Sequence, residues 1–177
     1  MTRHANDFYK TPASLVKALA IHLPPYLGHV LDPACGDGVF DQQLRRRDNV
    51  RTWVNLDICP QENVSMFTVG DFLTVTFATR MFDTIITNPP FSLMTQFIKK
   101  GLSLEPRRLI YLARLSILGS QERYRELWTQ VPAPSSLIVM PKRPSFTGGG
   151  SDNSEYAWFC WGEMPQLGLS WMDPTTY

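Results

Sequence analysis

The hydrophobic pattern alternates between short apolar runs and stretches with apolar residues every three or four positions. Apolar runs of about four to eight residues are typical of buried strands, and the wider spacing is typical of covering helices. The pattern predicts helices over 13–22, 39–47, 93–102 and 121–128. It predicts strands over 29–32, 52–57, 65–69, 82–87, 108–115, 136–140, 156–161 and 167–172.

The order of these elements indicates the fold class. Strands and helices alternate along most of the chain, which is typical of an α/β protein with a doubly wound, mainly parallel sheet. The run 82–87 has few polar interruptions, as expected of a strand covered on both faces. The last two strands, 156–161 and 167–172, follow one another without a helix, so we predict an antiparallel C-terminal hairpin at the edge of the sheet.

Composition adds a size and an environment. The 177 residues, 44% of them hydrophobic and 19% charged, suit one domain with a full core. No apolar run approaches the ~20 residues that cross a bilayer, and the N-terminus has no apolar signal region, so we expect no membrane association. Three cysteines without metal-ligand spacing favour a cytoplasmic location, and three scattered histidines give no metal site.

The charge balance is nearly neutral, with 17 basic and 16 acidic residues and a net charge of +1. Nucleic-acid-binding domains are more often strongly basic, so any such site must be a local patch. The candidate patches are 45–47, 99–100, 107–108 and 142–143, and each can also be read as a solvated helix end or turn.

The tetrapeptide Asn88-Pro89-Pro90-Phe91, directly after the run 82–87, carries the strongest chemical signal. The Asn88 side-chain oxygen and the Pro89 carbonyl can each accept one N–H of a planar amine. The two prolines stiffen the loop and donate no backbone hydrogen bond. Phe91 offers a face for ring stacking. The pattern therefore predicts a site that orients an exocyclic amine or an amide toward an electrophile.

A second signal follows the first strand. Gly36 and Gly38 allow the backbone to approach a ligand closely, but the third glycine of a dinucleotide fingerprint is missing. Asp32, Asp57 and Asp71 end or follow three successive predicted strands, so they are expected at the ligand edge of the sheet. Such an acidic rim is poor for phosphates and suits a cation that carries a ribose and an adenine, although one aspartate alone is more often a cap.

Together these motifs make the chain resemble S-adenosylmethionine-dependent amino-methyltransferases of the DNA adenine-N6 and cytosine-N4 type. The segment 32–38 resembles the cofactor motif of that family, the tetrapeptide 88–91 resembles its catalytic motif, and 8–12 resembles the segment that precedes the cofactor motif in the gamma arrangement. The similarity covers nearly the whole chain. It implies a Rossmann-like methyltransferase sheet with S-adenosylmethionine as cofactor and no metal.

The resemblance also implies residue roles. The residues matching Thr11 and Asp32 hold the methionine end, Asp57 binds the ribose, and Asn88 acts at both cofactor and target amine. The full cofactor set that it implies is Tyr9, Thr11, Pro12, Asp32, Pro33, Ala34, Gly36, Asp57, Ile58, Asp71, Phe72 and Asn88. The catalytic set is Asn88, Pro89, Pro90 and Phe91.

The resemblance favours the N6 amine of adenine in DNA, flipped out or unpaired, as in small phage-encoded enzymes. Phe91 would stack on the base. Phe146 would either cover its other face or pin the loop 142–154, which its three glycines predict to be mobile. Lacking a separate recognition domain, the chain is expected to read short or loose sequences as a monomer or weak dimer.

Alternatives remain open for the acceptor. They are N4 of cytosine, an RNA adenine N6 or guanine N2, a glutamine amide in protein, and a catalytically silent partner that binds DNA or the cofactor. Silent partners usually lose the tetrapeptide or the acidic rim, and both are present here. We expect a single methyltransferase domain over 1–177, with an N-terminal segment 1–27, a cofactor half 28–80 and a catalytic half 81–177.

Overall fold

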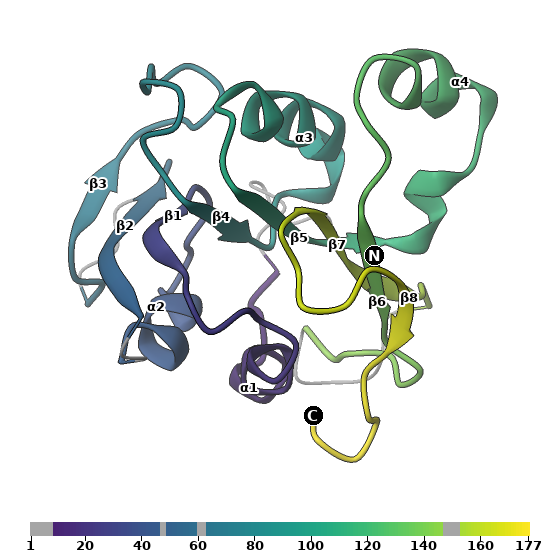
Figure 1. Cartoon of the computed structure of the whole chain (residues 1–177), viewed down its shortest axis with the longest axis horizontal. Helices are drawn as coiled ribbons and strands as arrows, with labels where there is room; N and C mark the ends of the chain where they lie inside the picture. Colours follow the sequence, from purple (N-terminus) through teal and green to yellow (C-terminus); the bar gives the residue numbers. More distant parts are fainter. Residues whose placement is uncertain (1–8, 47–48, 60–62, 147–152) are drawn as a thin grey trace.

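The described strands form one eight-stranded sheet with the order β3-β2-β1-β4-β5-β7-β6-β8 (Figure 1). This computed structural model describes residues 9–46, 49–59, 63–146 and 153–177. The strands are β1 (Gly28–Asp32), β2 (Val50–Asp57), β3 (Phe67–Val69), β4 (Thr84–Thr87), β5 (Arg108–Arg114), β6 (Ser136–Val139), β7 (Tyr156–Gly162) and β8 (Gly168–Trp171).

Helices cover both faces of the sheet, with α1 and α2 on one side and α3 and the helical turn η3, which follows α4, on the other (Figure 1). The helices and helical turns are α1 (Ala13–Ala20), α2 (Val39–Leu44), η1 (Phe91–Leu93), α3 (Met94–Ser103), η2 (Leu115–Leu118), α4 (Gln121–Arg123) and η3 (Tyr124–Trp128). Among the described residues, no helix has the length and apolar character needed to span a membrane.

Three predicted helices end early or change type in the structure, and the first of them, α1, ends at Ala20 rather than at residue 22. The helix α2 stops at Leu44, short of the predicted 39–47, of which 47 lies outside the described residues. The predicted helix 121–128 becomes one α-helical turn followed by the π-helical turn η3. In this wider turn Leu127 is buried, while the indole N–H of Trp128 donates to the Ile117 carbonyl at 3.0 Å. The irregular turn allows the Leu127 side chain to be buried while the Trp128 indole keeps its hydrogen bond.

The first five strands are parallel. β1 pairs with β2 and β4, β2 pairs with β3, and β4 pairs with β5. The chain runs outward from β1 to β3 and then returns to the other side of β1, so the strand order reverses between β1 and β4. The predicted doubly wound, mainly parallel sheet is confirmed. Ligands of such sheets bind outside the carboxyl ends of the strands at this reversal.

The C-terminal part of the sheet contains antiparallel pairs, as predicted, but with different partners, and the last strand, β8, pairs parallel with β6. β7 pairs antiparallel with both β5 and β6, and β6 separates β7 from β8. The prediction that 156–161 and 167–172 form a hairpin with each other is therefore wrong. Residues 156–161 are buried throughout, which requires an interior position, whereas β8 is largely exposed and suits the edge.

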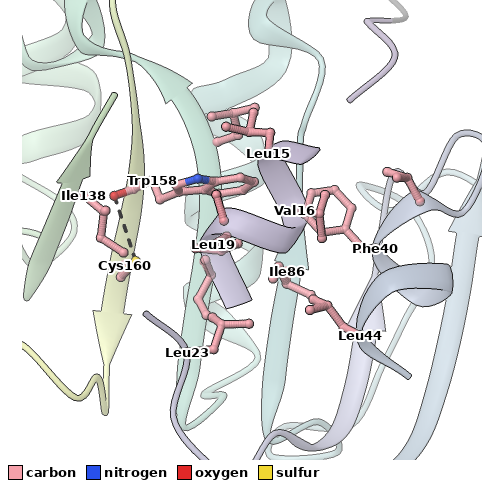
Figure 2. Close-up of a cluster of buried hydrophobic side chains, with 14 of the residues drawn as sticks. Leu15, Val16, Leu19, Leu23, Phe40, Leu44, Ile86, Ile138, Trp158 and Cys160 are labelled. Carbon is pink, nitrogen blue, oxygen red and sulfur yellow. Dashed lines mark hydrogen bonds between the residues drawn. The ribbon is translucent and has the colours of Figure 1, made fainter. Parts of the chain in front are cut away.

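Two apolar layers fix the sheet between its helices. In the first, Leu15 and Leu19 of α1 pack in one cluster with Trp158 of β7 (Figure 2). In the second, Phe97 of α3 and Leu127 of η3 pack against the opposite face. Because both faces of the central strands are covered, the carboxyl ends of β1, β2 and β4 are held in fixed relative positions.

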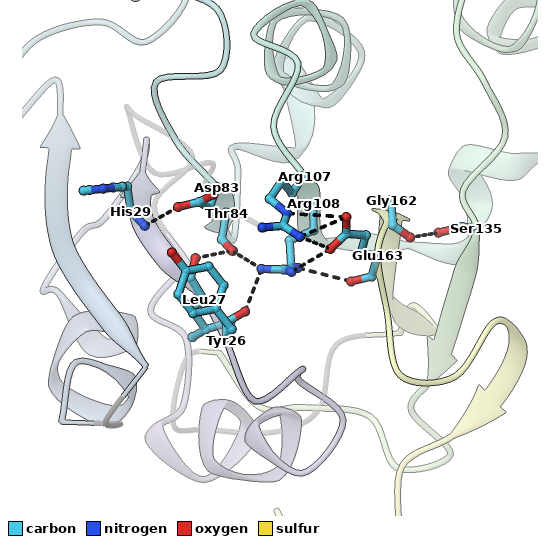
Figure 3. Close-up of polar contacts among 10 residues, drawn as sticks. All are labelled: Tyr26, Leu27, His29, Asp83, Thr84, Arg107, Arg108, Ser135, Gly162 and Glu163. Carbon is cyan, nitrogen blue, oxygen red and sulfur yellow. Dashed lines mark hydrogen bonds and ion pairs between the residues drawn. The ribbon is translucent and has the colours of Figure 1, made fainter.

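A buried arginine ties together the amino-terminal edge of the sheet (Figure 3). Arg108 is 3% exposed, and its Nη1 donates to the Tyr26 carbonyl at 2.7 Å and to the Thr84 hydroxyl at 3.1 Å. Its Nε donates to the Glu163 carbonyl at 3.1 Å, and its Nη2 lies 3.3 Å from the Glu163 carboxylate. The network joins β4 and β5 to the turns before β1 and after β7.

Replacing Arg108 by alanine should lower the free energy of unfolding by about 3 kcal/mol, because several buried acceptors lose their donor at once. Arg107→Ala is the matched control, since Arg107 pairs with the same glutamate at 3.0 Å while half exposed and should lower the free energy of unfolding far less. Urea denaturation measures both. Equal, small losses in the two variants would contradict a role for the buried network.

Candidate active site

A cavity of about 510 Å³ opens at the carboxyl ends of the parallel strands. That volume falls within the range of roughly 300–1,000 Å³ that holds small ligands and cofactors. Its walls come from the N-terminal segment, the turns after β1, β2 and β3, the loop after β4 and the helix α3. The lining residues are Tyr9, Lys10, Thr11, Pro33, Ala34, Cys35, Gly36, Asp37, Val39, Phe40, Asp57, Ile58, Cys59, Asp71, Phe72, Asn88, Pro90, Leu93 and Phe97.

The turn after β1 is held open by its glycines and by Asp57. Gly36 and Gly38 have φ of 51° and 73°, a left-handed conformation that side chains disfavour. The Gly36 N–H donates to Asp57 Oδ2 at 2.9 Å, and the Cys59 N–H donates to Asp57 Oδ1 at 3.0 Å. A carboxylate can accept about four bonds, so Asp57 can hold the turn and still accept from a ligand in the cavity.

Asp32 lies elsewhere than the sequence led us to expect. It is fully buried and is absent from the lining of the cavity, although its neighbours Pro33 and Ala34 belong to that lining. Burial raises the pKa of its carboxyl to about 8. Its Oδ1 accepts weakly from the Ala34 N–H at 3.4 Å, and its buried Oδ2 has no hydrogen-bond partner. In the free protein this carboxyl is therefore mostly protonated near neutral pH.

The other predicted cofactor residues form the far wall of the cavity. Asp71 follows β3 and accepts from the Leu73 N–H at 2.9 Å. Phe72 is buried in the wall, while Ile58 is 53% exposed at the end of β2. These two apolar side chains line the same cavity as the carboxylates of Asp57 and Asp71, so this wall offers both apolar contact and hydrogen-bond acceptors to a ligand. The predicted site residues that do not line this cavity are Pro12, Asp32, Pro89 and Phe91.

The Asn88 side chain is oriented by the N-terminal segment. Its Nδ2 donates to the Tyr9 carbonyl at 3.2 Å and to the Thr11 hydroxyl at 3.0 Å. Because a backbone carbonyl can only accept, this contact assigns the amide nitrogen to that side. The Asn88 Oδ1 is then buried without a partner. Such an acceptor costs about 1–3 kcal/mol, so its position calls for a donor from outside the chain.

The next two residues lie on either side of a partition. Pro90 lines the first cavity, whereas Phe91 lines a second cavity of about 330 Å³, and Tyr9 lines both. The residues of the second cavity are Tyr9, Phe91, Ser92, Met94, Thr95, Ala113, Arg114, Ser116, Ile117 and Arg123. The tetrapeptide thus separates two cavities, with the unsatisfied Asn88 oxygen beside the partition.

Phe91 belongs to an aromatic cluster. Its ring centroid lies 5.2 Å from that of Tyr9 and 5.5 Å from that of Tyr156, and the Arg114 guanidinium lies 4.7 Å from it. Phe146 is 8% exposed and lies 5.1 Å from Tyr156. Of the two readings of Phe146, the structure shows the one in which it pins its loop to the body. Residues 147–152 of that loop, including the three glycines, lie outside the described residues.

Neither cavity is lined by a described residue of the basic patches expected from the sequence. Arg107 and Arg108 belong to the amino-terminal edge, and Arg143 pairs with Glu155 at 2.7 Å. Lys99 donates to Gln130 at 2.7 Å. The arginines that do line the second cavity, Arg114 and Arg123, were missed. Arg114 could have been found, because it ends a buried strand and so reaches the ligand edge of the sheet.

Comparison with solved structures identifies the fold. One neighbour is a methyltransferase subunit of a type I restriction-modification system from Streptococcus thermophilus, with TM-score 0.63, 14% identity, and coverage of 90% of this chain and 46% of that one. A second neighbour is a protein from Listeria monocytogenes assigned to the class I S-adenosylmethionine-dependent methyltransferases. It has TM-score 0.65 and 15% identity, with coverage of 94% of this chain and 68% of that one. A dimethyladenosine transferase from Plasmodium falciparum has TM-score 0.59 and 16% identity, with coverage of 86% of this chain and 62% of that one.

The chain therefore has the Rossmann-like fold of methyltransferases. It spans less than half the length of the Streptococcus subunit. No protein-family model matches the sequence, and no curated protein matches it either. At these low identities the neighbours establish the fold, while the ligands and the reaction have to be argued from the cavities.

The buried Asp32 predicts a pH dependence of stability. The folded protein holds this proton up to about pH 8, whereas the unfolded chain releases it near pH 4, so the stability contributed by this group declines as pH rises between those values. Asp32→Asn mimics the protonated form. We expect it to match the wild type near pH 4 and to be the more stable protein at pH 8, as measured by urea denaturation. Parallel pH profiles would contradict this.

Proposed function

We propose that this chain transfers a methyl group from S-adenosylmethionine to the exocyclic N6 amine of adenine in DNA. The observation that carries the proposal is the buried, unsatisfied Oδ1 of Asn88, placed beside the partition between the two cavities. An amine N–H of the acceptor would satisfy this oxygen, and the Pro89 carbonyl would accept the second N–H. The Pro90 carbonyl already accepts from the Leu93 N–H at 2.9 Å.

The first cavity fits the methyl donor by charge. Asp37, Asp57 and Asp71 line it together with one cation, Lys10, which pairs with Asp37 at 2.9 Å. S-adenosylmethionine is a sulfonium with an ammonium group, a ribose and an adenine. Asp57 would accept from the ribose hydroxyls, and Phe72 and Ile58 would bind the adenine. Thr11 and the buried Asp32 would serve the methionine end, where an ammonium favours the ionised carboxyl.

The bound cofactor would supply a methyl group that is already activated by the positive sulfur. The task of the chain is then to position the acceptor. Asn88 Oδ1 and the Pro89 carbonyl would accept the two amine hydrogens and draw the nitrogen out of conjugation with the ring, so that its lone pair is directed toward the first cavity. Because Tyr9 and Thr11 hold the Asn88 amide, the oxygen is oriented before the acceptor arrives.

A covalent relay through the chain is disfavoured. Cys35 lines the first cavity, but burial raises the pKa of its thiol well above the usual range, so it stays protonated and a weak nucleophile. We therefore propose direct transfer to the amine, whose proton leaves to solvent with or after the methyl group.

Adenine in DNA is favoured over the other acceptors by the resemblance of the motifs and by the neighbours. One neighbour is a methyltransferase subunit of a restriction-modification system and another is a dimethyladenosine transferase. The described residues after the tetrapeptide mostly build α3 and β5 to β8, so base-sequence readout falls to the connecting loops. We accordingly propose a short or loose target sequence.

The proposal predicts that Asn88→Ala lowers the turnover of labelled methyl transfer to DNA by about a hundredfold or more, the loss typical of removing one preorganised polar contact. The same variant should change the free energy of unfolding by no more than about 1 kcal/mol. The reason is that two hydrogen bonds are lost while one unsatisfied buried oxygen is removed. Steady-state kinetics and urea denaturation provide the two readouts.

Asn49→Ala is the matched control for this experiment. Asn49 also has a buried Oδ1 without a partner, but it lies where β2 begins, at the opposite edge of the sheet. The control should keep the turnover of the wild type. Wild-type turnover in Asn88→Ala, or an equal loss in both variants, would overturn the proposed role.

A further inference from the structure

The second cavity differs from the first in its charge. Among the described residues that line it, the charged side chains are Arg114 and Arg123, and aspartate and glutamate are absent. The first cavity is lined by three aspartates and one lysine. Consecutive residues of one tetrapeptide, Pro90 and Phe91, thus face an acidic cavity and a basic one. A cationic methyl donor explains the first, and the second calls for an acceptor that carries negative charge.

Arg123 is placed to meet that charge. The Ser120 hydroxyl accepts from the Arg123 backbone N–H at 3.2 Å, which anchors the start of α4 beside η2. The Arg123 Nη1 donates to the Ser116 carbonyl at 2.6 Å, which fixes the guanidinium at the cavity. A guanidinium has five N–H donors, so a single carbonyl leaves most of them for a ligand. Its planar fork matches the oxygens of a phosphate.

Arg114 fills a different role in the same cavity. Its guanidinium lies over the Phe91 ring, and its Nε donates to the Tyr156 hydroxyl at 3.1 Å. These contacts hold it against the aromatic cluster, where a planar base could stack beside it. Arg123 comes from the separate segment after η2, so the base and the anion of a ligand would be bound by different elements.

We infer that the second cavity binds one nucleotide of a nucleic acid, with its base against Phe91 and its phosphodiester held by Arg123. This inference rests on the proposed methyl transfer for its acceptor, and it names the substrate class from the cavity itself. A glutamine side chain carries no negative charge, so it would give the Arg123 guanidinium no ionic partner. DNA and RNA share the phosphodiester, so the experiment has to separate them.

The test measures binding of a short, fluorescent single-stranded oligonucleotide with one adenine among thymines, in DNA and RNA forms, by anisotropy without the cofactor. Arg123→Gln should weaken binding by about tenfold at low salt. It should also lower the slope of log affinity against log salt by about 0.7, the value for one phosphate contact on a single strand. Arg123→Lys should keep the slope, because a lysine retains the charge.

Arg125→Gln is the matched control, since Arg125 is an exposed arginine two residues away that does not line this cavity. It should bind like the wild type. A sharper comparison replaces the phosphate next to the adenine by an uncharged methylphosphonate. That change should weaken binding of the wild type and have little further effect on Arg123→Gln.

An unchanged salt slope in Arg123→Gln, or a wild-type protein that binds neither oligonucleotide, would overturn the inference. Failure of the inference is distinguishable from failure of the proposed function, because an unchanged salt slope in Arg123→Gln together with wild-type methylation of DNA adenine would remove the phosphate site and keep the methyltransferase. Conversely, a chain that binds oligonucleotides through Arg123 but does not bind S-adenosylmethionine in calorimetry would keep the phosphate site and lose the methyltransferase proposal.

Discussion

The hydrogen bonds from the Asn88 amide nitrogen to Tyr9 and Thr11 are the contacts on which the candidate site depends. They bind the end of β4 to a segment that precedes the first helix, and they decide which way the amide points. Because the nitrogen is taken by the chain, the oxygen is left buried without a donor. A buried acceptor without a donor lowers the stability of the folded protein, and a ligand that donates a hydrogen bond to it would relieve this cost. Of the two cavities beside the tetrapeptide, the first would hold the methyl donor and the second would hold the methyl acceptor.

The two edges of the sheet divide the work of stability and binding. At the amino-terminal edge, Arg108 satisfies several acceptors with one buried side chain and joins turns that are distant in sequence. At the carboxyl-terminal edge, the turns after β1 and β4 keep the buried acceptors Asp32 Oδ2 and Asn88 Oδ1 unsatisfied. Burial raises the pKa of the Asp32 carboxyl to about 8, and a positively charged ligand group nearby would lower this pKa again. Apolar packing on both faces of the sheet holds the strands at this second edge in place, so the loops that follow them can present unsatisfied groups to a ligand.

The sequence predicted the features that follow from local pattern. The parallel sheet came from alternating runs, and Asp57, Asp71 and Asn88 came from their positions at strand ends. It did not predict that β7 lies between β5 and β6, because pairing partners depend on burial across the whole sheet. The burial of Asp32 was missed for the same reason, whereas the burial of Phe146 matches one of the two readings that the sequence left open. Arg123 had no signal at all: it lies on a short irregular helix, and only the fold brings it to the cavity beside Phe91.

The central claim is that the two cavities bring a methyl donor and the amine of a nucleobase to opposite sides of Asn88. It is tested most directly by incubating the protein with labelled S-adenosylmethionine and DNA, RNA and protein in parallel, then digesting the products and identifying the labelled compound. The account predicts label in N6-methyladenine from DNA. Label found only in RNA or in N4-methylcytosine would contradict the proposed acceptor, and label only in a protein amide would contradict both the proposed acceptor and the nucleotide cavity.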